Sequence, residues 1–394
     1  MENKRTVVMA NPSADVYGAD LQLLESVAAL RERGWRIVVV VPSSGPLVPR
    51  LEALGAEVEI LPFPVLRRAD LSVSNMARLV GTSAGAIARM ARLLRRVRPE
   101  LVYVNTITLP WWLVAARRCG LPSVCHVHEA EARDRALVRR VLAAPLVLAG
   151  ATIVNSATTL EVTSQAAPYL RRRLRLVHNG VRGPASPPIA RPPASPYRLL
   201  VVGRISPRKA PDTALEATAL LRAEGRAVEL ELCGTPGPGH EGYFAELCAR
   251  AEQPDLAGAV TFTGYQSPIW PALERADVLL APSQGESFGN AVVEGQLARR
   301  AVVATAVQGH LETVEHGITG LLVPVGDAAA MAAAVARLMD WPECARQVAF
   351  LGMRRAEGSF GLRRYSEEIA AVVAEIGKVP ARASVEPRAR IGQT

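Results

Sequence analysis

The stretch Val278–Glu294 reads VLLAPSQGESFGNAVVE and combines an apolar run, a loop and the start of a helix. The run 278–281 is short and wholly apolar, which is typical of a strand buried on both faces of a parallel sheet. Glu286 then falls in the loop after the strand, and Glu294 falls one or two turns into the helix. The stretch therefore predicts a strand–loop–helix unit with two carboxylates beyond the carboxyl end of the strand.

The alternation of strand and helix patterns continues along the chain in both directions. Strands are predicted at 6–10, 36–41, 57–61, 101–104, 123–128 and 152–155, and again at 198–203, 228–233, 260–263, 278–281 and 301–305. Helical patterns lie at 21–33, 48–54, 75–98, 210–224 and 363–376. This alternation indicates an α/β fold of two Rossmann-like parallel-sheet domains that face a central cleft, where ligands bind beyond the carboxyl ends of the strands.

A proline-rich segment, GVRGPASPPIARPPASP at 180–196, separates the two halves and is typical of an interdomain linker. We accordingly predict an N-terminal domain at 1–180, a linker at 181–197 and a C-terminal domain at 198–365. A helix at 366–377 follows, and its packing on the N-terminal domain is one arrangement that we consider. Residues 378–394 are predicted to be a disordered tail.

Composition places the chain among globular proteins. Of its 394 residues, 49% are hydrophobic and 21% charged, which excludes the disordered, collagenous and disulfide-scaffold classes. The five cysteines form no CxxC pair, so they favour a reducing compartment over a zinc site or a disulfide framework. No secretory signal is visible, and the longest apolar run, 141–154, is too short to span a bilayer and predicts a buried segment. We expect a cytoplasmic protein.

Two cations follow the first strand of the second half. Arg204 and Lys209 lie beside a helix start, which suits a diphosphate because arginine offers a fork and lysine a mobile point charge. Lys209 is one of only three lysines among 46 basic residues. In the first half, the small-residue turn around Gly18 leads into a helix and presents backbone N–H groups to an anion. Solvated loop charges and an ordinary turn are the alternative interpretations.

Two histidines lie at the end of the strand predicted at 123–128. His126 and His128 share one face of that strand because side chains alternate with a period of two. Three interpretations stay open: two buried structural histidines, a polar group of the site, or a metal site for which no third ligand is evident.

The two carboxylates of the opening stretch suit sugar recognition, because one carboxylate accepts hydrogen bonds from two neighbouring hydroxyls. Glu286 and Glu294 would together hold two sugar rings, and Gly289 and Asn290 place backbone amides at the N-terminus of the helix. The alternative is that the helix dipole alone favours glutamates there.

These motifs, taken in order, resemble glycosyltransferase family 4, whose members have the GT-B fold. Glu286 and Glu294 match its Glu-x7-Glu signature. The other similar segments are Tyr17-Gly18-Ala19-Asp20, His178-Asn179-Gly180-Val181, Val202-Gly203-Arg204 with Lys209, and His310-Leu311-Glu312 followed by 317–327. The chain departs from the family at Leu311 (often proline), at Gln308 (often glycine) and at Tyr17, which replaces the first glycine of a frequent pair.

The resemblance implies how a nucleotide-sugar donor binds. Arg204 and Lys209 would neutralise its diphosphate, and the Gly18 loop would contact the diphosphate from the other domain. Glu294 would bind the ribose hydroxyls. Family members need neither a metal nor a cofactor beyond the nucleotide sugar, and the chain has no Asp-x-Asp pair of the kind that metal-dependent transferases usually show.

The transferred sugar would lie against the loop that precedes the helix. The resemblance implies that Glu286 binds its hydroxyls, with help from backbone amides near Phe288, Gly289 and Asn290. His128 would lie at the cleft near the reacting sugar. The fallback assignment for that histidine is His126.

The activity that the resemblance implies is a retaining glycosyltransferase, with the acceptor bound by the N-terminal domain at 1–180 and the nucleotide-sugar donor by the C-terminal domain at 198–365. It would move a hexose-type sugar from a UDP- or GDP-sugar to a hydroxyl acceptor, expected to be a lipid-linked or cell-surface saccharide of polysaccharide biosynthesis. Fixed cations would stabilise the charge that develops on the departing diphosphate. The alternatives are a sugar-nucleotide epimerase of the same fold, glycosylation of a small natural product, and a non-catalytic sugar-nucleotide-binding subunit.

The positive charge is concentrated in the first half. The net charge is +9, with 24 basic and 14 acidic residues in 1–180 and 22 and 23 in 181–394. Much of this positive charge comes from clustered arginines. Arg78, Arg89, Arg92, Arg95, Arg96 and Arg98 flank an apolar stripe, and others lie at 67–68, 133, 135, 139–140 and 171–173. They favour peripheral docking on the anionic inner face of the plasma membrane, and a solvated arginine-rich surface is the alternative. Nucleic acid is not expected, because we find no recognised reader motif and aromatics are only 5%.

Overall fold

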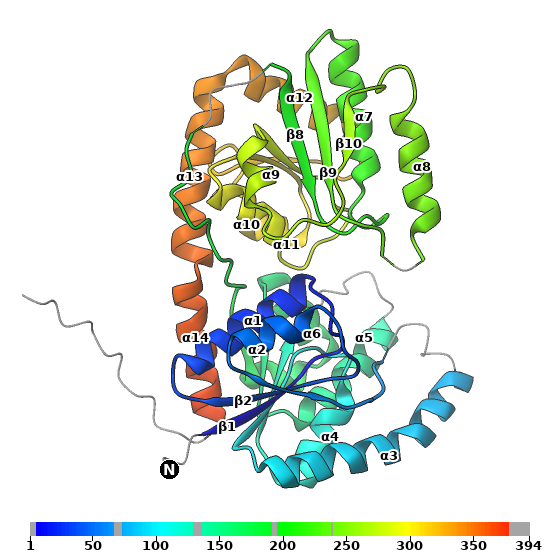
Figure 1. Ribbon diagram of the computed structural model, residues 1–394, viewed down its shortest axis with the longest axis vertical. Helices are drawn as coiled ribbons and strands as arrows, with labels where there is room; N and C mark the ends of the chain where they lie inside the picture. Colours follow the sequence, from blue (N-terminus) through cyan, green and yellow to red (C-terminus); the bar gives the residue numbers. More distant parts are fainter. Residues whose placement is uncertain (1–4, 67–72, 129–135, 191–194, 238, 378–394) are drawn as a thin grey trace, which may run out of the picture.

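The structure, a computed structural model, describes residues 5–66, 73–128, 136–190, 195–237 and 239–377, and the side chains of 73–82 are not described. Two α/β domains lie one above the other along the long axis of the molecule, with a column of two helices along one side (Figure 1). Each domain is built on one parallel sheet covered by helices on both faces. The predicted fold class of two Rossmann-like parallel-sheet domains is therefore confirmed.

The first domain contains a seven-stranded sheet in the order β3-β2-β1-β4-β5-β6-β7. Its strands are β1 (Thr6–Ala10), β2 (Arg36–Val41), β3 (Glu57–Ile60), β4 (Leu101–Val104), β5 (Ser123–Val127), β6 (Ala151–Val154) and β7 (Leu174–Leu176). Its helices are α1 (Gly18–Arg31), α2 (Leu47–Ala53), α3 (Val73–Val97), α4 (Pro110–Arg118), α5 (Ala136–Ala143), α6 (Ala157–Ala166) and the short 3-10 helices η2 (Ala144–Leu148) and η3 (Pro168–Arg173). Alternate residues of the central strands belong to two separate apolar clusters, one on each face, which explains their continuous apolar sequence.

The second domain contains a six-stranded sheet in the order β10-β9-β8-β11-β12-β13. Its strands are β8 (Tyr197–Val202), β9 (Val228–Cys233), β10 (Val260–Phe262), β11 (Val278–Ala281), β12 (Ala301–Thr305) and β13 (Leu321–Val323). Its helices are α7 (Pro211–Ala223), α8 (Glu241–Ala251), α9 (Trp270–Arg275), α10 (Asn290–Leu297), α11 (Gln308–Thr313), α12 (Ala328–Asp340) and α13 (Pro342–Phe360). The stretch 278–294 forms β11, a loop and the first part of α10, as its pattern predicts.

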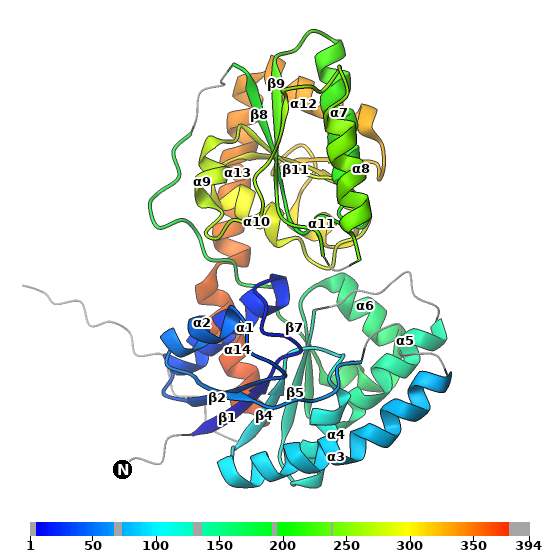
Figure 2. The same cartoon turned by 45° about the vertical axis from the view of Figure 1, so that its right-hand side comes forward.

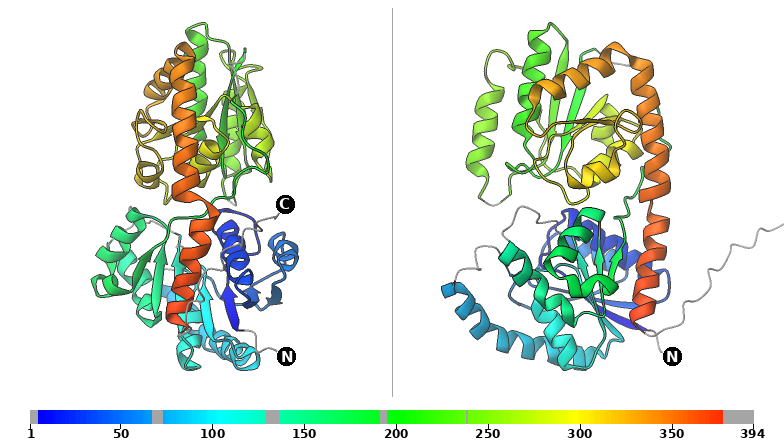
Figure 3. Two further views of the ribbon diagram at one scale, coloured as in Figure 1. Left: turned by 90° about the vertical axis from the view of Figure 1, so that its left-hand side faces the viewer. Right: turned by 180° about the vertical axis from the view of Figure 1, so that it is seen from behind.

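The last described helix, α14 (Leu362–Ile376), returns to the first domain and packs against α1 (Figure 3). Tyr365 is fully buried there, and its hydroxyl lies 2.6 Å from the Ser26 hydroxyl. A backbone bridge between Val181 and Gly361 marks where the chain crosses between the domains in both directions. The helix starts within one residue of the pattern predicted at 363–376. The domain boundary predicted between 365 and 366 falls inside it, because Tyr365 is already part of the apolar cluster of the first domain.

Two further details differ from the sequence expectations. The apolar run 141–154 is not one buried segment: it includes the end of α5, η2 and β6, and Val141 and Val147 are 40% and 48% exposed. The second domain begins with β8 at Tyr197, inside the predicted linker.

Several predicted features lie outside the described residues or side chains. The arginines at 67–68, 133 and 135 and the tail 378–394 lie outside the described residues, and the side chain of Arg78 is not described. Among the described helices, none combines the length and the apolar character that crossing a bilayer requires.

Candidate functional site

A cleft of about 1110 Å³ lies between the two domains. It runs past the carboxyl ends of strands from both sheets, where parallel-sheet proteins bind ligands. All of the predicted site residues line it: Gly18, His128, Arg204, Lys209, Glu286, Phe288, Gly289, Asn290 and Glu294. His126, the fallback assignment, does not line the cleft. The fold thus brings the predicted residues of both domains to one cavity.

Lys209 and Glu286 form an ion pair in the floor of the cleft. Only 11% of the Glu286 side chain is exposed, compared with 30% of the Lys209 side chain. Burial alone would raise the pKa of Glu286, but the charge and hydrogen bond of Lys209 outweigh it and bring that pKa to about 2. The carboxylate that the resemblance assigns to the sugar is therefore ionised, and it is paired with the lysine that the resemblance assigns to the diphosphate.

The loop around Glu286 is held by the start of α11. The Glu286 backbone N–H donates to Gln308 Oε1 at 3.1 Å, and the Gly309 N–H donates to the Glu286 carbonyl at 3.0 Å. A side chain at Gly309 would clash with the backbone of Phe288, because a Cβ there would lie 2.4 Å from its Cα. Gly309 is thus required for the close approach of α11 to this loop.

The N-terminus of α10 faces the same part of the cleft. Gly289 caps the helix with a φ of 102°, a left-handed conformation that favours glycine. Asn290, the first residue of the helix, accepts a hydrogen bond at its Oδ1 from Asn179 Nδ2 at 2.9 Å. Asn179 lies just before the chain crosses to the second domain, so this bond joins the start of α10 to the crossing segment.

Glu294 differs from Glu286 in its pairing. Burial raises the pKa of Glu294 to about 7, although Lys209 opposes the shift. Within the part of the chain that the structure describes, no hydrogen bond or salt bridge engages the Glu294 carboxylate. A partly buried, unpaired carboxylate in a cleft is a typical binding group for vicinal hydroxyls, because a ligand can supply the hydrogen bonds that the protein does not.

The histidines lie at the end of β5 and are both buried. His126 Nδ1 lies 2.6 Å from the Tyr103 hydroxyl, and His128 Nε2 lies 3.0 Å from Asn105 Oδ1. Burial lowers the pKa of His128 to about 3 and lowers that of His126 well below its usual value. Both imidazoles are therefore neutral at physiological pH. Among the described residues, no group of three or more His, Cys, Asp or Glu side chains is arranged to hold a metal ion.

A buried chain of hydrogen bonds connects His128 to the first loop of the chain. Asn105 Nδ2 donates to Asn11 Oδ1 at 2.8 Å, and Asn11 Nδ2 donates to Asp20 Oδ1 at 2.7 Å. Asp20 Oδ2 in turn accepts the backbone N–H of Tyr17 at 3.1 Å. The chain orients the loop before α1 and the cleft histidine as one unit.

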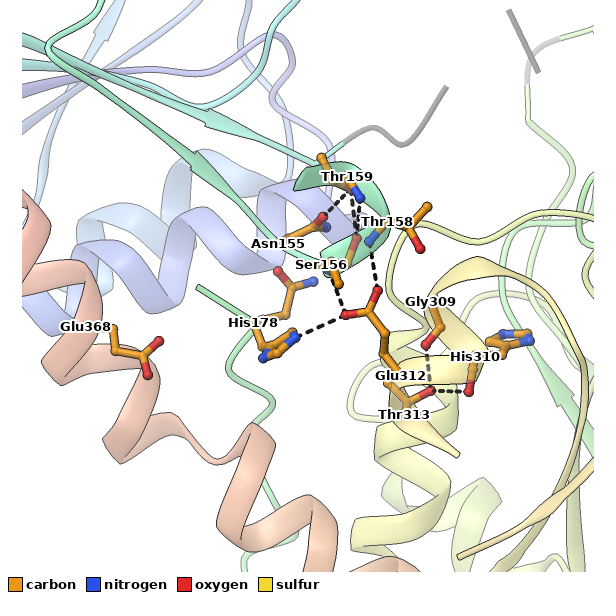
Figure 4. A network of polar contacts seen from close by, with 12 residues as sticks. Asn155, Ser156, Thr158, Thr159, His178, Gly309, His310, Glu312, Thr313 and Glu368 are labelled. Atoms are coloured by element: carbon orange, nitrogen blue, oxygen red, sulfur yellow. Dashed lines mark hydrogen bonds and ion pairs between the residues drawn. The ribbon is translucent and has the colours of Figure 1, made fainter. Parts of the chain in front are cut away.

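A second contact between the domains lies beside the cleft, where α11 faces α6 (Figure 2). The Glu312 carboxylate accepts the backbone N–H groups of Ala157 and Thr158 at 2.8 and 3.0 Å, and it lies 3.1 Å from His178 Nε2 (Figure 4). Burial raises the pKa of Glu312, but these hydrogen bonds outweigh it and hold that pKa below 4.5. Glu312 thus caps a helix of the first domain from the second.

Three contributions were not evident from the sequence. The sequence marks Tyr17 and Gln308 only as departures from the family and gives Tyr265 no role, yet all three contact residues of the cleft. A search for polar or aromatic residues after every predicted strand would have found Tyr265, which follows β10. The cross-domain role of Glu312 had no sequence signal of its own.

Family models match both halves of the chain. The model described as Glycosyltransferase Family 4 matches residues 16–182, and the model described as Glycosyl transferases group 1 matches residues 196–340. Together these matches support a family 4 glycosyltransferase.

Relatives that match most of the chain also have the names of glycosyltransferases. The D-inositol 3-phosphate glycosyltransferase of Actinosynnema mirum is 27% identical over 382 residues, which cover 87% of this chain and 87% of the relative. The glycogen synthase of Mycobacterium tuberculosis is 27% identical over 317 residues, which cover 75% of this chain and 73% of the relative. These names support glycosyltransferase activity.

Solved structures show the same fold. Anabaena HepE in complex with UDP-glucose superposes with a TM-score of 0.79 at 21% identity and covers 94% of this chain and 99% of that chain. The sucrose-phosphate synthase of Thermosynechococcus elongatus superposes with a TM-score of 0.78 at 20% identity and covers 94% of this chain and 99% of that chain. The architecture of the chain is GT-B.

Proposed function

Starting from a glycosyltransferase with the GT-B fold, we propose that the chain transfers a hexose-type sugar from a UDP- or GDP-sugar to a hydroxyl acceptor with retention of configuration. One observation carries the proposal: Arg204, Lys209, Glu286 and Glu294 line one wall of the interdomain cleft. A nucleotide-diphosphate sugar needs cations for its phosphates and acidic acceptors for its hydroxyls. The complex of HepE with UDP-glucose supports a uridine donor.

In the proposed complex, each charged group of the second domain has one task. Arg204 and Lys209 neutralise the diphosphate, and the N–H groups around Gly18 face it from the first domain. Glu294 binds the ribose hydroxyls, which is consistent with its unpaired carboxylate. Glu286 binds the sugar hydroxyls, and amides near Phe288, Gly289 and Asn290 assist it.

The reaction that this arrangement favours is a front-face substitution. The bond between the anomeric carbon and the diphosphate oxygen breaks, the acceptor oxygen bonds to the same carbon, and the acceptor proton passes to the departing phosphate. The cations stabilise the charge that develops on the diphosphate, so the proposal requires no metal ion. His128 lies at the cleft as a neutral imidazole that can hydrogen-bond a sugar hydroxyl.

The acceptor is proposed to be a lipid-linked or cell-surface saccharide, reached by a cytoplasmic enzyme at the inner face of the plasma membrane. Exposed basic side chains on α3 and directly after it support this location: Arg89, Arg92, Arg95, Arg96 and Arg98. One of them, Arg96, is paired with Glu59. Flotation with anionic vesicles at low salt tests the membrane part, and an unchanged position of the protein in the gradient would exclude it.

The activity is tested by incubating the purified protein with a panel of UDP- and GDP-sugars and following release of the nucleoside diphosphate. Release that depends on a saccharide acceptor, with retention of configuration by NMR, is the expected result. An isomerised sugar nucleotide without acceptor would identify an epimerase. Binding without turnover on any acceptor would identify a non-catalytic subunit, and transfer only to small natural products would change the acceptor class.

A further inference from the structure

Tyr17 contacts the arginine of the diphosphate clamp from the opposite domain. It lies in the loop just before α1 of the first domain and is half-buried in the cleft wall. The Cζ atom of Arg204, in the second domain, lies 3.8 Å from the centroid of the Tyr17 ring. At this distance the guanidinium is within reach of the negative face of the ring, so the contact is a cation–π interaction.

Further contacts hold the Tyr17 ring in place. Tyr265, from the second domain, packs edge-on against it with ring centroids 6.1 Å apart and an interplanar angle of 67°. The Tyr265 hydroxyl donates to the Val16 carbonyl at 3.1 Å, and Asp20 Oδ2 accepts the Tyr17 backbone N–H. The second domain thus contacts both the backbone and the ring of the loop that contains Tyr17.

Arg204 is held by packing and not by polar partners. A Cβ at Gly237 would lie 2.9 Å from Arg204 Cδ, so the side chain runs closely past this glycine before it reaches Tyr17. In the residues that the structure covers, no acceptor engages the guanidinium, which is exposed to the cleft. A guanidinium that contacts a ring through its face still offers its N–H groups around the edge, where a phosphate binds two at once.

We propose that Tyr17 is a positioning residue that holds the Arg204 guanidinium in its phosphate-binding orientation, and that this orientation depends on the approach of the two domains. The inference rests on the proposed donor function and adds to it a residue of the opposite domain. Without the ring, Arg204 is a long, flexible side chain that loses its rotamer freedom only when the diphosphate binds.

Calorimetric titration with UDP, GDP, uridine and guanosine tests this role in the full chain. We expect Tyr17→Leu to weaken binding of the diphosphate by about 3–30-fold, the range of a cation–π contact, and to leave nucleoside binding unchanged. Tyr17→Phe keeps the ring and should bind within about twofold of wild type. Tyr169→Leu, at a residue 59% exposed outside the cleft, is the matched control.

The decisive measurement is Tyr17→Leu in an Arg204→Met background. If Tyr17 acts through Arg204, the second substitution adds no further loss, because the guanidinium that it positions is gone. Additive losses, or an equal loss for nucleosides, would overturn the inference while leaving donor binding by the wild type intact. A wild-type protein that binds neither diphosphate would overturn the proposed function as well.

Discussion

The two walls of the cleft differ in how their polar groups are paired. In the second domain, Lys209 and Glu286 form an ion pair, and within the described residues the Glu294 carboxylate is unpaired. In the first domain, His128 and Asn105 belong to a buried chain of hydrogen bonds, and the imidazole is neutral. Under the proposed function, the second domain supplies a donor wall, whose charges a ligand can take over. The first domain supplies an acceptor wall, which is preorganised and does not change charge.

The comparison predicts that the largest effect follows loss of a charge from the donor wall. Lys209→Ala removes the cation that we propose binds the diphosphate and leaves Glu286 buried without its counter-ion, so the pKa of Glu286 rises. Charge-assisted contacts are worth about 1.5–3 kcal/mol, which predicts a loss of about 10–150-fold in donor binding or turnover. Calorimetry with the donor measures it. Arg226→Ala, at an arginine paired with Asp340 outside the cleft, is the control and should behave like wild type.

Glu294→Gln is expected to weaken donor binding about tenfold, because a neutral amide replaces a charged acceptor. The same change should stabilise the free protein at pH 8. The pKa of Glu294 is raised from 4.5 to about 7 on folding, so the free energy of unfolding falls as pH rises between these values, where the unfolded chain has already lost the proton.

Replacement by glutamine removes this cost of burying a charge, about 1–3 kcal/mol above pH 7, and leaves stability near pH 4.5 almost unchanged. Thermal unfolding at pH 5 and pH 8 measures the difference. A variant that is less stable than wild type at pH 8 would contradict a raised pKa at this position.

A smaller effect, on stability, is expected for the contact between α11 and α6 that joins the two domains beside the cleft. Glu312→Gln keeps the size of the side chain but loses its charge and one acceptor oxygen, so Tm should fall by a few degrees at neutral pH. The lowered pKa of Glu312 stabilises the fold above 4.5, and this stabilisation is lost as pH falls through the folded-state value.

Wild type and Glu312→Gln should therefore converge in Tm at acid pH. Glu161→Gln, on the same helix α6 and exposed, is the control. An unchanged Tm in Glu312→Gln at neutral pH would show that the helix cap contributes nothing to the contact between the domains.

The smallest effect is predicted for titration of the acceptor wall. Because the pKa of His128 is about 3, its imidazole does not gain a proton between pH 5 and 8. The pH profiles of kcat for wild type and His128→Gln should then run parallel in this range, whatever the loss of rate. A step near pH 6.5 that only the wild type shows would mean that His128 becomes charged. The first-domain side of the cleft would then change charge as the second-domain side does.

Much of the fold and of the candidate site could be predicted because the relevant signals are local. The opening stretch contains its own strand, loop and helix start, and its apolar run matches β11 residue for residue. Glu286 and Glu294 could be assigned to the cleft because carboxyl ends of parallel strands share one edge of a sheet. The domain boundary between 365 and 366 differs from the structure because no local pattern shows that the first turn of α14, with Tyr365, packs on the first domain.

The sequence by itself determined the two α/β domains, the order of the motifs and the residues that line the cleft, because apolar periodicity and turn chemistry act between near neighbours. Only the tertiary structure decided which residues, distant in the sequence, contact one another. Lys209 and Glu286 are 77 residues apart, and Glu312 and Ala157 are 155 apart. Tyr17 and Arg204 come from different domains. The Lys209–Glu286 pair depends on β8 and β11 lying side by side in one sheet, and the other two pairs depend on how the two sheets approach each other. No local stretch of the chain encodes either arrangement.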